Sequence, residues 1–419
     1  MGEMYAGGES MSSPPGRGEK RVIGYNNEDR NWCIIPRPTG LMMTNEDSSG
    51  CSDTFSSNLL PGLPDEITID HVITRLPWRT LSTVFSVSRA WQHAITSRQV
   101  YDARVRTRST QTLIAMTHFD TSMGVDKWTN LVSVYDTFTF KWHLLPQIPG
   151  IHRGVPNLCC CVSSQGKLYV IGGASKSDVF ARNEVHSFDP TGPGKWEKCA
   201  SMASPRQSFA SGVKDGKIYV FGGAGADRLS EVYDPAQDEW HPIAPMLSFR
   251  LEPKVICFQN EFFLHSGMPT ELERSHFEGM DEGFAEAYNI RNDEWRRIDH
   301  FSRHGHREIL FEIRGKLHRI FDSQLDFYDD ASMAWKVSQT ISWNVLNRKG
   351  AQNVHAFPAA VVALDGELLS LVYRYASGKG VRLVPLRSDG LGMKNRELGW
   401  TKIPCSVPLQ WDWLCSIQL

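Results

Sequence analysis

Short apolar runs alternate with turn-forming residues over most of the chain after residue 111, the pattern that strands and tight turns produce. Two stretches are near copies of each other, QGKLYVIGG at 165–173 and DGKIYVFGG at 215–223. Each has a glycine-containing turn, a β-rich run and a double glycine. An aromatic–Asp pair and a tryptophan follow both copies: Phe188-Asp189 with Trp196, and Tyr233-Asp234 with Trp240. Such internal repeats predict a fold built from small sheets that stack on one another.

Degenerate copies extend the repeat in both directions. They consist of Tyr135-Asp136 with Trp142, Tyr288-Asn289 with Trp295, Tyr328-Asp329 with Trp335, and a last copy from Asp365 to Trp400. The six tryptophans are 54, 44, 55, 40 and 65 residues apart, close to the period of about 50 residues of a four-stranded kelch blade. Residues 105–419 therefore resemble kelch repeats, and the resemblance implies a mainly β fold, a six-bladed kelch β-propeller.

The first and last repeats predict how the ring closes. The first copy begins at 112–116 and is one strand short, while 413–419 is a strand-like run without a blade. We expect this C-terminal strand to complete the first blade, because pairing would remove two exposed sheet edges.

Residues 59–104 predict a small helical domain. Ile69, Val72, Ile73 and Leu76 fit one face of a helix, and Pro77 interrupts it. A second amphipathic helix is predicted by positions that repeat at spacings of three and four residues: Leu81, Val84, Ser88, Trp91 and Ile95. About 45 residues cannot bury much surface alone, so an apolar face is expected to remain for a partner.

This segment resembles the F-box. LPDEI at 63–67, LP at 76–77 and VSRAW at 87–91 match its three submotifs in order. The resemblance implies docking onto the Skp1-type adaptor of a cullin ubiquitin ligase, with Trp91 packed inside the domain. By position the adaptor contacts would be Leu63, Pro64, Ile67, Leu76, Pro77, Leu81, Val84 and Val87. The alternative is a helical hairpin packed on the downstream domain.

Together the two resemblances point to the plant-type F-box/kelch proteins, which implies a substrate receptor that holds a target protein for ubiquitination and proteasomal degradation. Two alternatives stay open, a ligase-independent kelch scaffold and a metalloenzyme built on the propeller. The sequence has no GxxxxGK[ST] loop, GxSxG elbow, HExxH motif or ExxxDxxxH iron motif, so no catalytic residue and no cofactor are expected. His300, His304 and His306 are the dense histidine run; they would suit a metal, but a polar loop is the preferred interpretation.

Target-binding residues are expected on the propeller loops. Arg206 and Arg250 occupy matching positions between repeats, with Arg153 and either Arg303 or Arg307 as looser equivalents. Trp128, on another long loop, and Trp343 are candidate aromatic anchors. An arginine ring would grip acidic side chains through bidentate contacts. The preferred alternative is that these arginines satisfy carboxylates and carbonyls of neighbouring blades.

Composition limits the classes of partner and the cellular compartment that are expected. Lys and Arg total 45 against 47 Asp and Glu, which argues against bulk capture of nucleic acid, and no apolar run is long enough to span a membrane. Residues 1–58 are rich in polar residues and glycine, which predicts a disordered N-terminal tail. Nine cysteines without a CxxC pair or a secretory signal indicate reduced thiols in the cytoplasm or nucleus, and Cys159–Cys161 are expected to be buried.

Overall fold

A computed structural model represents the chain. The structure describes residues 58–120, 129–137, 139, 141–151, 154–174, 180–267, 284–301, 308–313, 315–321, 324–332, 334–340, 358–364, 368–374, 381–386 and 414–418. The expected tail lies outside these residues up to position 57.

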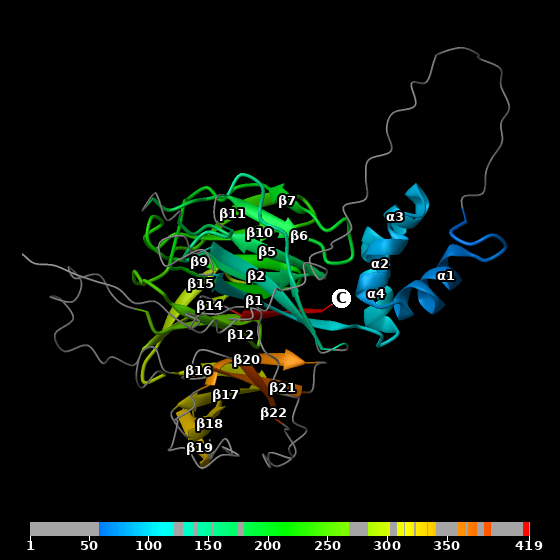
Figure 1. The fold of residues 1–419 in the computed structure, drawn as a ribbon. Helices are drawn as coiled ribbons and strands as arrows, with labels where there is room; N and C mark the ends of the chain where they lie inside the picture. The colour runs from blue at the N-terminus through cyan, green and yellow to red at the C-terminus, as the bar shows by residue number, and fades with distance from the viewer. Residues whose placement is uncertain are drawn as a thin grey trace, which may run out of the picture. The chain divides into compact units, whose positions relative to one another are not determined.

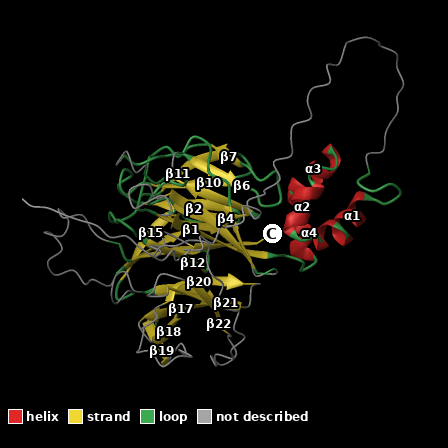
Figure 2. Cartoon of the chain, viewed as in Figure 1, coloured by secondary structure: helices red, strands yellow, loops and turns green. Residues whose placement is uncertain are grey.

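Four helices and one short 3-10 turn follow one another from residue 65 to residue 106 (Figures 1 and 2). They are α1 (Asp65–His71), η2 (Ile73–Arg75), α2 (Trp78–Val84), α3 (Arg89–Thr96) and α4 (Arg98–Arg106). Pro64 and Pro77 precede α1 and α2. Proline has no backbone N–H, and none is needed at the start of a helix, where the first N–H groups have no partner within the helix.

The single helix expected over 81–95 is wrong, because the chain forms two helices there. The side chain of Ser88 accepts a hydrogen bond from the backbone N–H of Trp91 at 3.3 Å and starts α3 afresh. A serine in extended conformation at this position is a typical helix N-cap, and its effect outweighs the apolar periodicity that runs through it.

The described residues after the helices form six antiparallel sheets (Figure 1). Five have four strands. In the order of their pairing, their strands are β23 (Leu414–Gln418), β1 (Thr112–Asp120), β2 (Thr129–Asp136) and β3 (Lys141–Leu144); β4 (Cys160–Ser164), β5 (Lys167–Ile171), β6 (Val185–Phe188) and β7 (Trp196–Cys199); β8 (Ala210–Lys214), β9 (Lys217–Phe221), β10 (Ser230–Asp234) and β11 (Glu239–Ile243); β12 (Lys254–Phe258), β13 (Glu261–His265), β14 (Ala285–Asn289) and β15 (Glu294–Ile298); and β16 (Ile309–Ile313), β17 (Lys316–Phe321), β18 (Gln324–Asp329) and β19 (Ala334–Thr340). The remaining sheet has three described strands, β20 (Pro358–Leu364), β21 (Leu368–Arg374) and β22 (Val381–Leu386).

The first strands of neighbouring sheets contact each other in a closed cycle, β23–β4–β8–β12–β16–β20–β23. Such a cycle of radial sheets is a β-propeller. The expectation of six complete blades is not matched, because five sheets have four strands and the described part of the last has three. Trp400, the tryptophan predicted for the last repeat, lies outside the described residues.

The two ends of the propeller meet in one sheet. β23 pairs antiparallel with β1 in a register that places Leu414 opposite Met116 and Gln418 opposite Thr112. The C-terminal strand therefore covers the edge of β1, as the short first repeat predicts, and it also contacts the neighbouring strands β4 and β20.

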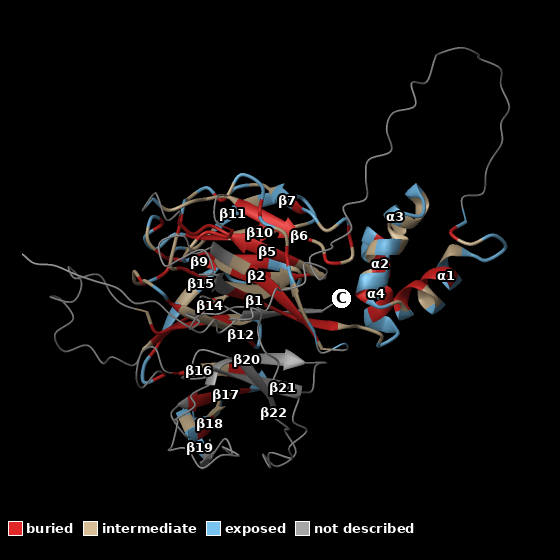
Figure 3. Cartoon of the chain, viewed as in Figure 1, coloured by how far each residue is buried: buried red, intermediate tan, exposed pale blue. Residues whose placement is uncertain are grey.

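The repeated aromatic residues build the core within and between blades. In each four-stranded sheet the aromatic residue of the third strand packs on the tryptophan of the fourth, with ring centroids 5.0 to 5.2 Å apart. The indole N–H of Trp240 also donates to the carbonyl of Ala200 at 2.9 Å, and that of Trp295 to the carbonyl of Ala244 at 2.8 Å. Each of these tryptophans thus joins its blade to the connection before it, and buried residues line the strands of the ring (Figure 3).

The double glycines are required by close approach as well as by backbone conformation. Gly223 has φ +86°, and a Cβ there would lie 2.6 Å from the carbonyl oxygen of Gln207. Gly173 has φ +90° and would place a Cβ 2.6 Å from the carbonyl of Asn157. No side chain fits without displacing the backbone of the preceding connection.

Candidate protein-interaction surfaces

Exposed apolar side chains mark the helical segment. Leu63 is 39% exposed, Ile67 46% and Val87 65%, although the segment has a core of its own. Pro64 and Pro77 are exposed as well. Large apolar side chains left in water by a small domain favour a docking surface for another protein.

The predicted set of adaptor contacts included Leu81, but this side chain is fully buried. It packs with Ile69, Ile73, Ile95 and Val100 in the core of the helical segment. Its position in the F-box resemblance placed it with the adaptor contacts. An apolar residue at this position also fits the inner face of α2, and only the packing of α2 on the other helices distinguishes the two. Leu76 and Val84 are half-buried against the same core.

Trp91 lies where the sequence analysis expected it, in the interior of the segment. It is half-buried against the same core, and its indole N–H donates to the carbonyl of Leu59 at 2.8 Å. Helix α4 runs two residues past the predicted end of the domain at 104, and its Val105 side chain is 49% exposed.

Arg206 and Arg250 do not form an exposed ring for acidic targets, and that hypothesis is corrected. Arg206 is fully buried and forms an ion pair with Glu231 of β10. Its guanidinium also donates to the carbonyls of Gly222 and Leu229 at 3.1 and 3.0 Å. Glu231 accepts in turn from the backbone N–H of Ala203, in the preceding connection, at 2.8 Å.

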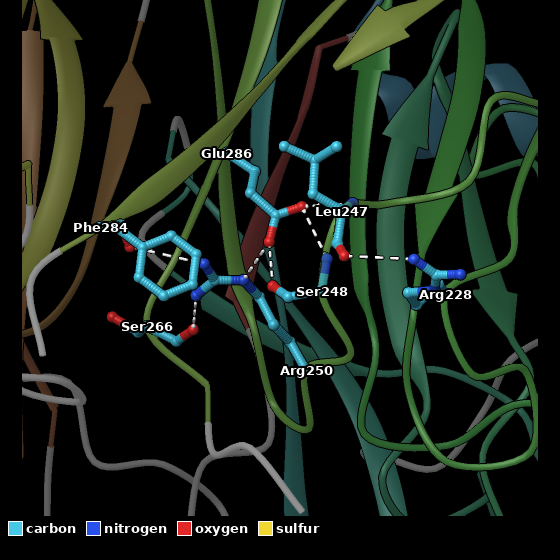
Figure 4. Close-up of polar contacts among 7 residues, drawn as sticks. All are labelled: Arg228, Leu247, Ser248, Arg250, Ser266, Phe284 and Glu286. Atoms are coloured by element: carbon cyan, nitrogen blue, oxygen red, sulfur yellow. Dashed lines mark hydrogen bonds and ion pairs between the residues drawn. The ribbon is translucent and has the colours of Figure 1, made fainter. Parts of the chain in front are cut away.

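The next blade repeats this arrangement (Figure 4). Nε of Arg250 lies 3.1 Å from Oε1 of Glu286, which is fully buried on β14, and Nη1 donates to the carbonyl of Ser266 at 2.7 Å. The guanidinium lies 4.4 Å from the ring centre of Phe284. Glu286 accepts from the backbone N–H of Leu247 at 2.8 Å. Both arginines thus join connections to blades, the alternative that the sequence analysis preferred.

Arg319 of β17 is a further buried arginine of the propeller, which no repeated motif had indicated. Its Nη2 lies 2.7 Å from Oδ2 of Asp326, and Glu308 lies 3.6 Å from Nη1. Arg153, Arg303, Trp128 and Trp343 lie outside the described residues.

The propeller has two unlike faces. Because successive strands are antiparallel, connections after the second and fourth strands of a blade emerge on one face, and those after the first and third on the other. The first-to-second connections include the two-residue turns 165–166, 215–216 and 259–260. The exposed large apolar side chains of the described loops all follow a second or fourth strand: Leu158, Phe180, Leu229 and Leu247. We call the face that carries them the long-loop face.

The described residues carry little sign of reactive chemistry. They contain no group of three His, Cys, Asp or Glu side chains placed to hold a metal, and His304 and His306 lie outside them. Burial raises the pKa of the Cys160 thiol to about 12. Burial also lowers the pKa of His265 to about 3, and the positive charges of Lys254 and Arg250 add to the effect. No helix in the described part of the chain is both long and apolar enough to span a membrane.

Comparison with known proteins adds a family context. A model of the Kelch motif matches residues 205–247. The chain is 28% identical over 277 residues to the F-box/kelch-repeat protein At2g44130 of Arabidopsis thaliana, covering 58% of this chain and 65% of that protein. It is 32% identical over 200 residues to F-box/kelch-repeat protein SKIP30 of the same plant (45% and 54% covered) and 29% identical over 214 residues to F-box protein AFR (48% and 55%). The chain thus spans between about half and two thirds of the length of these relatives.

Proposed function

Since the chain is a homologue of the F-box/kelch-repeat proteins of Arabidopsis thaliana, we propose that it is a non-catalytic substrate receptor of an SCF-type cullin ubiquitin ligase. The helical segment binds a Skp1-type adaptor, and the propeller holds a protein target for ubiquitination and degradation in the cytoplasm or nucleus. The observation that carries this proposal is the exposure of Leu63, Ile67 and Val87 in the submotifs that resemble the F-box.

The proposed adaptor surface consists of Leu63, Pro64, Ile67, Pro77 and Val87, with the half-buried Leu76 and Val84 beside the core. Full burial of a side chain such as leucine or isoleucine contributes about 1.5–3 kcal/mol. Because Leu63 and Ile67 are roughly two fifths to one half exposed, covering each of them would add about 1 kcal/mol.

The target is proposed to bind on the long-loop face. The exposed loop residues Leu158, Phe180, Leu229 and Leu247 support this, since apolar anchors surrounded by polar groups are typical of interface centres. Arg153, Arg303, Trp128 and Trp343 belong by chain order to connections of the same kind. We also propose that a fourth strand from the segment around Trp400 completes the last blade.

The mechanism is proximity. The receptor contributes no reacting group; it holds the target's lysines at high effective concentration near the charged ubiquitin carrier. The propeller suits this role because buried Arg–Glu pairs join its connections to its blades and hold the loops in place.

The test is capture of a purified Skp1-type adaptor by Leu63→Asp/Pro64→Ala protein. A carboxylate forced into an apolar interface without a partner costs several kcal/mol, so we expect at least a hundredfold loss of affinity. Val105→Asp is the matched control, because Val105 is similarly exposed but outside the proposed surface; it should bind normally. Both variants should keep the wild-type melting temperature. Adaptor binding retained by the double variant would contradict the proposal.

The ligase role needs a separate measurement. Affinity purification with mass spectrometry, with and without a proteasome inhibitor, should recover target proteins whose abundance rises when the proteasome is blocked. Targets that bind but do not respond to the inhibitor would favour a ligase-independent scaffold.

A further inference from the structure

An aspartate at the end of the third strand caps the following turn in the second and third blades. Asp189 accepts from the backbone N–H of Thr191 at 2.8 Å, and Asp234 accepts from that of Ala236 at 3.0 Å. Each side chain thus caps its own turn. In the first blade Asp136 does the same through Oδ1, which accepts from the N–H of Thr139 at 3.2 Å.

The second oxygen of Asp136 is used differently. Oδ2 accepts from the indole N–H of Trp78, the first residue of α2, at 3.0 Å. Both side chains are 1% exposed, so this hydrogen bond to a carboxylate is sealed from water. It joins the helical segment to the propeller across 58 residues of sequence.

Gln111, which precedes β1, completes the contact. Its side-chain oxygen accepts from the backbone N–H of Trp78 at 3.0 Å, and its amide nitrogen donates to Oδ1 of Asp136 at 3.3 Å. Pro77 offers no side-chain cap, so Gln111 satisfies one of the orphan donors at the start of α2. The ring of His143 on β3 meets the indole edge-on at 5.6 Å.

The same turn is held from the helical side. Nη2 of the buried Arg104, on α4, donates to the carbonyl of Leu76 at 2.6 Å. Only residues 107–111 separate α4 from β1, and the N–H of Ser109 in this linker donates back to the carbonyl of Arg104 at 3.0 Å. The turn 76–78 therefore has partners in α4 and in the first blade.

From these contacts we infer that Trp78 is a positioning residue that locks the helical segment onto the first blade, so that the two move as one body. A free linker of five residues would let the two parts reorient. The lock holds the turn 76–78, part of the proposed adaptor surface, at a fixed place on the propeller that carries the target. This consequence rests on the proposed function, whereas the lock itself does not.

The test is hydrogen exchange of the full-length protein, followed by mass spectrometry. Trp78→Phe keeps an aromatic ring and removes the N–H. Because hydrogen bonds to charged groups are the stronger ones, exchange in peptides covering 78–84 and 107–111 should rise at least about tenfold while 210–234 stays protected. Trp295→Phe is the matched control, since it loses an indole hydrogen bond inside the ring; it should leave 78–84 and 107–111 unchanged.

Unchanged exchange in these peptides for Trp78→Phe, or an equal rise for Trp295→Phe, would overturn the inference. If Trp78→Phe loses protection throughout the propeller, Gln111→Ala decides: it leaves the indole–carboxylate bond and should still raise exchange at 78–84 severalfold, and no change there would count against the lock. Adaptor capture is measured in parallel. Wild-type protein that binds no adaptor would refute the proposed function without affecting the lock.

Discussion

Replacing Arg250 by methionine tests whether the repeated arginines stabilise the propeller or bind a target. The change keeps most of the side-chain volume and removes the guanidinium. Glu286 would then keep its hydrogen bonds to the connection at Leu247 and Ser248 but lose its ion-pair partner in a site without solvent access. The carbonyl of Ser266 would lose a donor at 2.7 Å.

The expected cost follows from burial. Removing one partner of a buried ion pair typically costs about 3–5 kcal/mol, because the remaining charge is uncompensated. At roughly 2 °C per kcal/mol for a chain of this length, the melting temperature should fall by about 6–10 °C. Arg250→Met/Glu286→Leu removes both charges and should recover a large part of that loss.

The assay is thermal and urea unfolding followed by tryptophan fluorescence. Arg228→Met is the matched control, because Arg228 is exposed and its guanidinium donates a hydrogen bond of 3.3 Å to the carbonyl of Leu247. That variant should stay within about 0.5 kcal/mol of wild type. If Arg250→Met melted like Arg228→Met, or the double variant were less stable than the single one, the structural role assigned to Arg250 would be refuted.

Three further predictions concern stability and reactivity. His265 has a folded-state pKa of about 3 against 6.5 in the unfolded chain. As the pH falls below 6.5 the unfolded state takes up a proton first, so the stability that neutral His265 contributes above pH 6.5 is lost. Between pH 7.5 and 5.5, urea titrations should therefore show a decrease in unfolding free energy that is about 1.4 kcal/mol larger for wild type than for His265→Gln. Cys160, with a thiol pKa of about 12, should resist alkylation at pH 8 in the native protein and react only after unfolding, as peptide mass spectrometry would reveal; rapid native labelling would contradict its burial. Deleting 413–419 removes β23 and reopens an edge of the first sheet, so the ring should lose its cooperative unfolding transition, and unchanged melting would count against closure by this strand.

Much of the fold could be predicted because the same residue types recur at the same places in successive repeats. An aromatic residue packs on a tryptophan in each four-stranded blade, and double glycines recur in two of these blades, so a single chain already shows the pattern. The helical segment was less predictable. Leu81 has the same apolar character and spacing as exposed neighbours, and Ser88 divides a helix that the apolar period would continue.

Periodicity and turn chemistry are local properties, so the sequence alone predicts the repeating sheets, the helical segment before them and the unpaired strand that completes the first blade. Tertiary packing is needed to know which apolar residues stay exposed to water. It also pairs Arg206 with Glu231 and Arg250 with Glu286, and it brings Asp136 to Trp78. Those outcomes depend on which side chains from distant parts of the chain meet in a space closed to water. In such a buried space a charge without a partner is strongly destabilising, so each charged group must be paired. The spacing of residues along the sequence does not identify the partner.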